Sequence, residues 1–279
     1  MTNAETESQG KKIKPWAVGI GSIVVVIIVV AVVVTLVTSG NSDDEAAPAP
    51  SPAPSSTQQA PTQDIDASDQ GWDSAIADVF GREIKVPTNG VGNALGNAKD
   101  LDSTECNPKV GAELTIQRTS GTQTVWSQDI GPSDVNDQGV PGGYARSAEA
   151  ALLSASNDLT LLYSGGQIAA EVAKERLSVP DQDGLVAELE QATAKDTAYE
   201  DQPAPSAFRI TSCDETRVIG DVAVPLPTDA EGNSDSSTWG VLRVSSVWED
   251  GDWHTELGAT PQPIEDEVTD LEGWTQWQF

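Results

Sequence analysis

The chain has 279 residues, and 44 acidic against 15 basic residues give it a formal net charge of −29 at neutral pH. So much negative charge repels a phosphate backbone, which excludes nucleic acid as a partner. One histidine and two cysteines are too few to complete a tetrahedral zinc site easily. The sequence therefore predicts no metal and no cofactor.

Residues 16–37, which begin with Trp16 and end with Val37, contain no charge. A helix of about 20 apolar residues crosses a bilayer core, so we expect one transmembrane helix embedded in the lipid bilayer here. Lysines precede the segment and acidic residues follow it. The positive-inside rule then places residues 1–15 in the cytoplasm and the C-terminal part outside the plasma membrane.

Two alternatives compete for this segment. A signal peptide has an apolar region of only about 7–15 residues and ends at a small-residue cleavage site. Residues 38–41 match such a site poorly, although residues 46–49 could serve. A buried core helix is the other alternative, but one that is apolar on every side is unusual. The single-pass anchor is the favoured interpretation.

Residues 38–70 predict a disordered linker. Their central part is rich in Pro, Ala, Ser and Gln and has no apolar period, so it cannot bury a core. Residues 71–279 are then expected to form the extracytoplasmic domain, long enough for one large domain or two small ones.

The first elements of this domain are short. Apolar residues at helical spacing predict a short helix over residues 72–80, ended by Gly81. Residues 84–87 predict a brief extended segment. Residues 114–118 and 122–126 alternate in polarity around Ser120-Gly121, which predicts a hairpin.

Three helices are expected next. Ser147 is a typical N-cap, and residues 148–163 contain neither Gly nor Pro. Two further helices are predicted over residues 167–176 and 184–194, separated by Val179-Pro180.

After a loop rich in proline the apolar period changes from 3.6 to 2. Strands are predicted over residues 208–212, 217–226, 238–248 and 252–257, and residues 249–251 supply the turn between the last two. Helices followed by an antiparallel meander indicate an α+β fold.

Cys106 and Cys213 both lie in the predicted extracytoplasmic part. An even number of cysteines in an oxidising compartment predicts one disulfide between them. A catalytic or metal-binding thiol is the alternative, but neither cysteine has a histidine or a second cysteine nearby in sequence.

Residues 143–155, GYARSAEAALLSA, resemble the G-[FY]-A-H-T-P-x-G-A-L-L-A-A signature of an uncharacterised family of membrane-anchored actinobacterial proteins. Gly131-Pro132 is similar to the Gly-Pro of that family. The chain departs from the signature where the family has His, Pro and Gly, at Arg146, Ala148 and Ala150. The resemblance implies an architecture and no mechanism.

A second resemblance rests on the order of the elements and on the motif W-x-D-G-D-W at residues 248–253. An N-terminal membrane helix, then helices, then a curved antiparallel sheet is similar to the NTF2-like cone of extracytoplasmic scaffold proteins in conjugative secretion channels. The resemblance implies helices packed on one curved antiparallel sheet; fold-level likeness is a weak guide to function.

Three parts of the sequence carry residues that could take part in catalysis or ligand binding. His254 is the only histidine and lies on a predicted strand without a recognisable nucleophile, which argues against a hydrolase. Residues 229–235 space oxygen ligands as calcium loops do, but Ser234 and Gly240 stand where the EF-hand pattern needs Gly and Glu. Residues 90–96 miss the dinucleotide-binding spacing by one residue. We therefore expect no enzyme.

The aromatic residues Trp274, Trp277 and Phe279 lie near the end of the chain and are predicted either to dock on the core or to bind a partner. The leading hypothesis is a non-enzymatic scaffold with a protein partner in an envelope, conjugation or secretion assembly. The alternative is a binding module for a small ligand or a cell-wall fragment.

Overall fold

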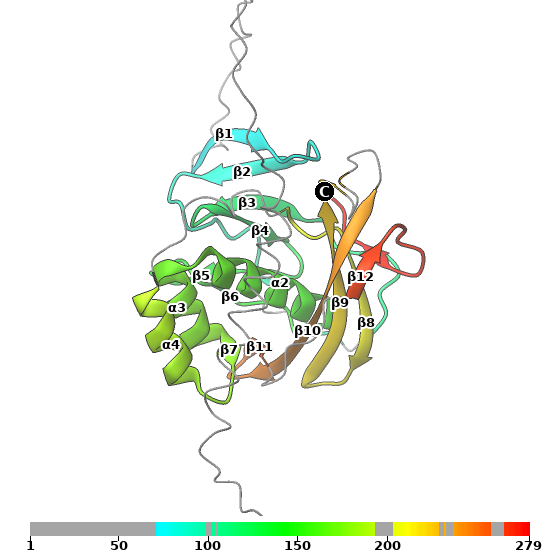
Figure 1. The fold of residues 1–279 in the computed structure, drawn as a ribbon. Coiled ribbons are helices and arrows are strands. Elements are labelled where there is room, and N and C mark those ends of the chain that lie inside the picture. The colour runs from blue at the N-terminus through cyan, green and yellow to red at the C-terminus, as the bar shows by residue number, and fades with distance from the viewer. Residues whose placement is uncertain are drawn as a thin grey trace, which may run out of the picture. The chain divides into compact units, whose positions relative to one another are not determined.

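The computed structural model describes residues 71–98, 102–103, 105–192, 203–228, 232, 237–257 and 265–279. The predicted tail (1–15), transmembrane helix (16–37) and linker (38–70) lie outside the described residues. Within them, no helix is both long enough and apolar enough to cross a membrane. The described part is α+β, with three helices packed against sheets (Figure 1).

The smaller sheet has four strands in the order β1-β2-β3-β4, antiparallel except for the parallel pair β2-β3. Its strands are β1 (Trp72–Ala77), β2 (Glu83–Pro87), β3 (Thr115–Thr119) and β4 (Thr122–Trp126). The predicted extended segment and hairpin are confirmed as β2, β3 and β4. A separate pair joins β5 (Asp134–Val135) to β6 (Pro141–Gly142).

The helix predicted over residues 72–80 is wrong. Residues 72–77 form β1, in which Ile76 lies opposite Ile84 of β2. The side chain of Ile76 is 42% exposed, so the apolar spacing does not mark a buried helical face. An isolated helix this short is marginal in water, whereas pairing with β2 satisfies the backbone.

The larger sheet has the order β13-β8-β9-β10-β11-β7, and β12 also pairs with β10. Its strands are β7 (Leu177–Ser178), β8 (Ala207–Cys213), β9 (Arg217–Leu226), β10 (Thr238–Glu249), β11 (Asp252–Glu256), β12 (Glu265–Val268) and β13 (Thr275–Gln276). The four predicted strands are confirmed as β8 to β11. Asp250 and Gly251 have positive φ angles, as a two-residue hairpin requires between β10 and β11.

The helices are α2 (Ala148–Ser164), α3 (Gly166–Arg176) and α4 (Gln182–Gln191). The Ser147 hydroxyl caps α2 by accepting a hydrogen bond from the Ala150 N–H, as predicted. Helix α4 begins two residues before the predicted start because the Asp181 carboxylate accepts from the Gly184 N–H and so provides the N-cap.

Helix α2 packs on β4 of the smaller sheet and on β8 to β11 of the larger one, so that it lies between them (Figure 1). The structure therefore has two sheets around this helix, where the resemblance implied one curved sheet. Leu152 and Leu153 of α2 are fully buried, with Val222 and Val244 of the larger sheet in the same core. A helix enclosed on both sides must also bury its polar residues, and these form the first candidate site.

Candidate functional site

One charged interior site is centred on Arg176, the last residue of α3, whose side chain is 6% exposed. Its Nε lies 3.3 Å from Asp158 Oδ1, and its Nη1 lies 2.7 Å from Asp252 Oδ2. Its Nη2 donates to Ser154 Oγ and to the Trp253 carbonyl. One guanidinium thus connects α2, α3 and β11.

The same site joins the two motifs on which the resemblances rest. The Asp252 carboxylate accepts from the backbone N–H groups of Gly143 and Tyr144, at 2.8 and 3.2 Å. The Trp253 indole donates to the Ala145 carbonyl at 2.9 Å. The start of β11, directly after the turn of the W-x-D-G-D-W hairpin, therefore holds the segment that leads into α2.

Burial and charge shift the pKa values of these groups. Burial raises the pKa of Asp158 to about 6, although Arg176 and the Thr255 hydroxyl lower it in part. Burial also raises the pKa of Tyr144. Burial alone would lower the pKa of Arg176, but Asp158 and Asp252 raise it overall. Arg176 is therefore permanently charged.

Each polar atom around Arg176 has an internal partner. Thr255 Oγ1 donates to Asp158 Oδ2 at 2.6 Å, and Asn157 Nδ2 donates to the Tyr144 hydroxyl at 2.9 Å. A catalytic acid or base needs a substrate within hydrogen-bond reach, and here protein atoms occupy those positions. The arrangement is suited to holding elements together.

Asn157 serves the adjacent edge of the smaller sheet. Its Oδ1 accepts from the Val125 N–H and its Nδ2 donates to the Val125 carbonyl, both at 2.8 Å. Strand β4 pairs with no further strand in the described part of the chain. The amide side chain therefore satisfies backbone groups that a neighbouring strand would otherwise bond.

A second buried carboxylate lies on the larger sheet. Asp221 on β9 is fully buried and bonds Arg209 on β8 and Arg243 on β10, at distances of 2.6 to 3.2 Å. Burial alone would raise the pKa of Asp221, but its hydrogen bonds to the two arginines lower it overall. This cluster connects three adjacent strands.

The three aromatic residues near the chain end occupy different environments. Trp277 is 5% exposed, contacts Phe208 with ring centroids 4.8 Å apart, and donates from its indole to Glu149 Oε1. Trp274 lies beneath Arg209, whose guanidinium carbon is 4.7 Å from the ring centroid. Trp274 and Trp277 therefore anchor the chain on the body, and Phe279, which is about half exposed, is the most exposed of the three.

Phe279 belongs to a surface group that we call the Arg82 patch, formed by Phe80, Arg82 and Phe279. The guanidinium carbon of Arg82 lies 5.7 Å from the Phe80 ring centroid and 4.8 Å from that of Phe279. The two rings are 41% and 49% exposed. Arg82 is fixed by Asp78 Oδ2 at 2.6 Å and by the Ala204 carbonyl at 2.9 Å. An immobilised cation thus displays two apolar rings.

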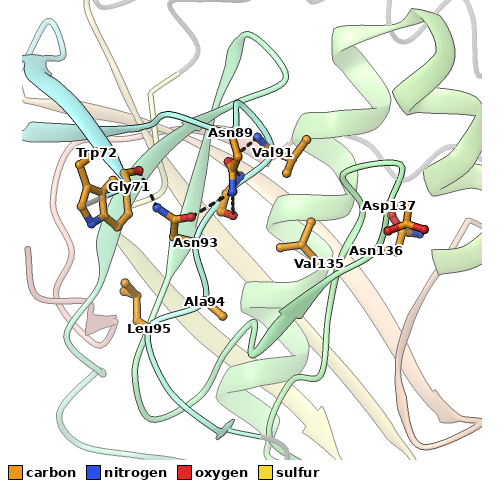
Figure 2. Close-up of a pocket in the computed structure, with 11 residues that line it drawn as sticks. Gly71, Trp72, Asn89, Val91, Asn93, Ala94, Leu95, Val135, Asn136 and Asp137 are labelled. Carbon is orange, nitrogen blue, oxygen red and sulfur yellow. Dashed lines mark hydrogen bonds between the residues drawn. The ribbon is translucent and has the colours of Figure 1, made fainter. Parts of the chain in front are cut away.

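A surface hollow of about 820 Å³ lies beside the start of β1. Figure 2 shows Trp72, Asn89 and Asn93 on one side of it and Val135 and Asp137 on another. Asn89 and Asn93 are hydrogen-bonded to each other, and Asn93 also donates to the Gly71 carbonyl (Figure 2). Residues 90–96, whose glycine spacing differs by one residue from the dinucleotide-binding pattern, form part of the wall of this hollow.

The remaining sequence candidates can be placed as follows. Cys106 and Cys213 are joined by a disulfide, with sulfur atoms 2.04 Å apart. His254 lies half-buried on β11, and burial and Arg176 lower its pKa. Most of the considered calcium loop, residues 229–235, lies outside the described residues. Among the residues described, no group of three or more potential ligands could hold a metal ion.

Comparison with known proteins gives the family. A model described as "Domain of unknown function (DUF8175)" matches residues 85–276, which is well over half of the chain, and the chain belongs to that family. No curated protein and no solved structure matches it. The two resemblances stated from the sequence are not tested by these comparisons and stay predictions.

Sequence reasoning missed Arg176, Asn157 and Arg82 as organising residues. For Arg176 and Asn157 a signal was present, because Ser154, Asn157 and Asp158 lie among the alanine and leucine residues of the predicted helix. Polar residues in a helix that is buried on all sides need internal partners. For Arg82 no local pattern could indicate a contact with Phe279 at the other end of the domain.

Proposed function

We propose that this protein is a non-enzymatic scaffold, anchored in the plasma membrane by residues 16–37, which holds its α+β domain outside the cell. In this proposal the domain binds another envelope protein, as part of a conjugation or secretion assembly. Support for the anchor comes from the uncharged apolar segment and its flanking charges. The disulfide fits an oxidising compartment.

The observation that carries the scaffold proposal is the contrast between interior charge and exposed apolar rings. The buried charges bond each other, whereas Phe80 and Phe279 are held in exposed positions by Arg82. Aromatic side chains and arginine are enriched where proteins bind proteins. The Arg82 patch is therefore the proposed partner surface, and of the predicted residues Trp274, Trp277 and Phe279 only Phe279 lies in it.

The chemistry of the partner follows from charge. The exposed acidic residue Glu83 follows directly after Arg82, at the start of β2, and the chain carries a net charge of −29. Opposite charge favours encounter and like charge opposes it. The proposed partner presents an apolar side chain surrounded by lysine or arginine.

The finer fold proposal, an NTF2-like cone, is supported by helices that lie against a large sheet of mainly antiparallel strands. The alternative function placed a ligand inside such a cone. Leu152, Val222 and Val244 pack together where α2 meets the sheet. A ligand is therefore better sought at the surface hollow than under α2.

A photo-crosslinking amino acid placed at Phe80 or Phe279 of the full-length protein, in membranes of its host, tests the scaffold proposal. Both positions should give the same crosslinked product, containing an envelope protein with a basic surface. The same probe at Glu188, an exposed residue of α4, is the control. Glu83→Lys should reduce the yield at Phe80 at least threefold.

Three results would refute the proposal. One is the absence of any product from Phe80 and Phe279, and another is the appearance of the same products from Glu188. The third concerns the anchor: a reporter fused to the C-terminus that is active only in the cytoplasm would remove the extracytoplasmic location and with it the proposed partner.

A further inference from the structure

The loop over residues 89–95, which forms one wall of the hollow, is built from internal hydrogen bonds. Asn89 Oδ1 accepts from the N–H groups of Val91 and Gly92, and Asn89 Nδ2 donates to the Gly92 carbonyl. The buried Gln117 side chain bonds both backbone groups of Asn93, at 2.7 and 2.8 Å. Two side-chain amides thus fix the loop before any ligand arrives.

Gly92 brings this loop against the core. Its φ is +116°, and a Cβ at this position would lie 2.4 Å from the Trp126 ring. A larger residue would be strained and would also collide with a fully buried indole. The loop therefore follows the sheet closely, and the hollow lies on its outer side.

The hollow retains unused hydrogen-bonding capacity. Within the described part of the chain, no bond is made by the Trp72 indole N–H or by the Asp137 carboxylate. Asn93 uses one amide hydrogen for the Gly71 carbonyl and one lone pair for Asn89, which leaves one hydrogen and one lone pair. The side chains of Val91, Leu95 and Val135 add apolar surface.

The charge of this lining sets the hollow apart from the chain as a whole. Among the described residues that line it, Asp137 is the only charged one, although the chain has a net charge of −29. The nearby ammonium of Lys85 lies 5.7 Å from the centroid of the Trp72 ring. An anionic ligand would be repelled by the surroundings, and a strongly cationic one would find a single carboxylate. The lining is matched to an uncharged ligand.

We propose that the hollow binds an uncharged oligosaccharide. Sugar hydroxyls both donate and accept, which suits an indole N–H, an amide and a carboxylate placed around one ligand. The C–H faces of a sugar ring pack on indole and aliphatic side chains such as Trp72 and Leu95. Because the loop is already fixed, binding costs little conformational entropy.

Saturation-transfer NMR with the full-length protein in nanodiscs tests this proposal, with chitotetraose, maltotetraose and xylotetraose as probes. At least one probe should show transfer, with a millimolar or tighter dissociation constant. Trp72→Ala should weaken its binding at least tenfold. Asp137→Ala changes an exposed side chain and should weaken it about threefold without altering the fold.

Phe80→Ala is the control, because it changes the Arg82 patch and not the hollow; it should leave the dissociation constant within twofold. The proposal is overturned if none of the three sugars shows transfer at 10 mM. It is also overturned if transfer persists unchanged in both Trp72→Ala and Asp137→Ala. These outcomes leave the scaffold proposal intact, since that one is tested by crosslinking at Phe80 and Phe279.

Discussion

Two arginines in this domain have opposite surroundings. Arg176 is buried and bonds two carboxylates, a hydroxyl and a carbonyl. Arg82 bonds one carboxylate and one carbonyl, and lies between two exposed phenyl rings. The first holds the interior together, and the second holds a surface ready for contact. A buried charged side chain whose donors are all hydrogen-bonded to protein atoms contributes to folding. A charged side chain that positions exposed aromatic rings prepares a binding surface.

The largest effect should follow from removing the buried arginine. Arg176→Leu leaves Asp158 and Asp252 without their cation, and breaking a buried pair in this way costs about 3–5 kcal/mol. Urea denaturation monitored by circular dichroism measures the loss. Lys174→Ala, which removes an exposed pair with Glu171, should cost less than about 0.5 kcal/mol. Equal losses in the two variants would break the comparison.

The next largest loss of stability should follow from removing the side-chain amide of Asn157, which hydrogen-bonds the backbone of β4. Asn157→Leu leaves the Val125 N–H and carbonyl unpaired and should cost about 2–3 kcal/mol. Hydrogen exchange of the Val125 amide should accelerate more than exchange in β9. Ser156→Ala removes only a bond to the Leu152 carbonyl and is the matched control, expected to cost about 1 kcal/mol or less. Unchanged exchange at Val125 would contradict this assignment.

The pH dependence of stability tests the part of the comparison that concerns the buried site around Arg176. The folded domain raises the pKa of Asp158 from 3.8 to about 6, so between these values the folded state binds a proton that the unfolded state does not. This contribution is fully present below about pH 4 and is lost as the pH rises through 6. Relative to Asp158→Asn, the wild type should lose on the order of 2 kcal/mol between pH 4 and pH 7.

The Asp158→Asn variant is needed for comparison because Asp221 changes the stability with pH in the opposite direction. Its pKa is lowered, so its contribution is lost as the pH falls. Comparing the urea midpoints of the wild type and Asp158→Asn at pH 4, 5.5 and 7 isolates the contribution of Asp158 to the stability. Parallel pH profiles of the two proteins would show that Asp158 does not titrate in this range.

The smallest effect on stability is expected at the Arg82 patch. Phe80→Ser and Phe279→Ser should each lower the free energy of unfolding by only about 1 kcal/mol, because roughly half of each residue is exposed. Trp277 lies two residues before Phe279 but is buried, so Trp277→Ala should cost about 3–5 kcal/mol. If Phe80→Ser unfolded the domain, the patch would be structural and the comparison would fail.

Periodicity in the sequence was a reliable guide where one element has one buried face or is buried throughout. The strands β8 to β11 and the helices α2 and α3 were predicted on this basis. It misled at residues 72–80, because Ile76, Val79 and Phe80 have helical spacing but are exposed. An apolar pattern indicates burial only when another element covers it. The exposed position of these residues depends on pairing between β1 and β2, which the pattern does not encode.

The candidate sites were harder to predict because they join distant segments. Asp252 bonds Gly143 and Tyr144 more than a hundred residues earlier in the chain, and Trp277 bonds Glu149 across a similar interval. The sequence showed the W-x-D-G-D-W and G-Y-A-R-S motifs separately. Their contact follows from the path of α2 between the sheets, which is a property of the packed fold.

The two edge strands of the smaller sheet, β4 and β1, differ in what lies beside them. On the β4 side, the Asn157 side chain occupies the position where another backbone would bond. On the β1 side, no strand follows among the described residues. In the described part of the chain, β1 therefore has an outer edge without a strand partner, and the register shift between Asp73 and Ile76 makes the pairing of β1 with β2 irregular.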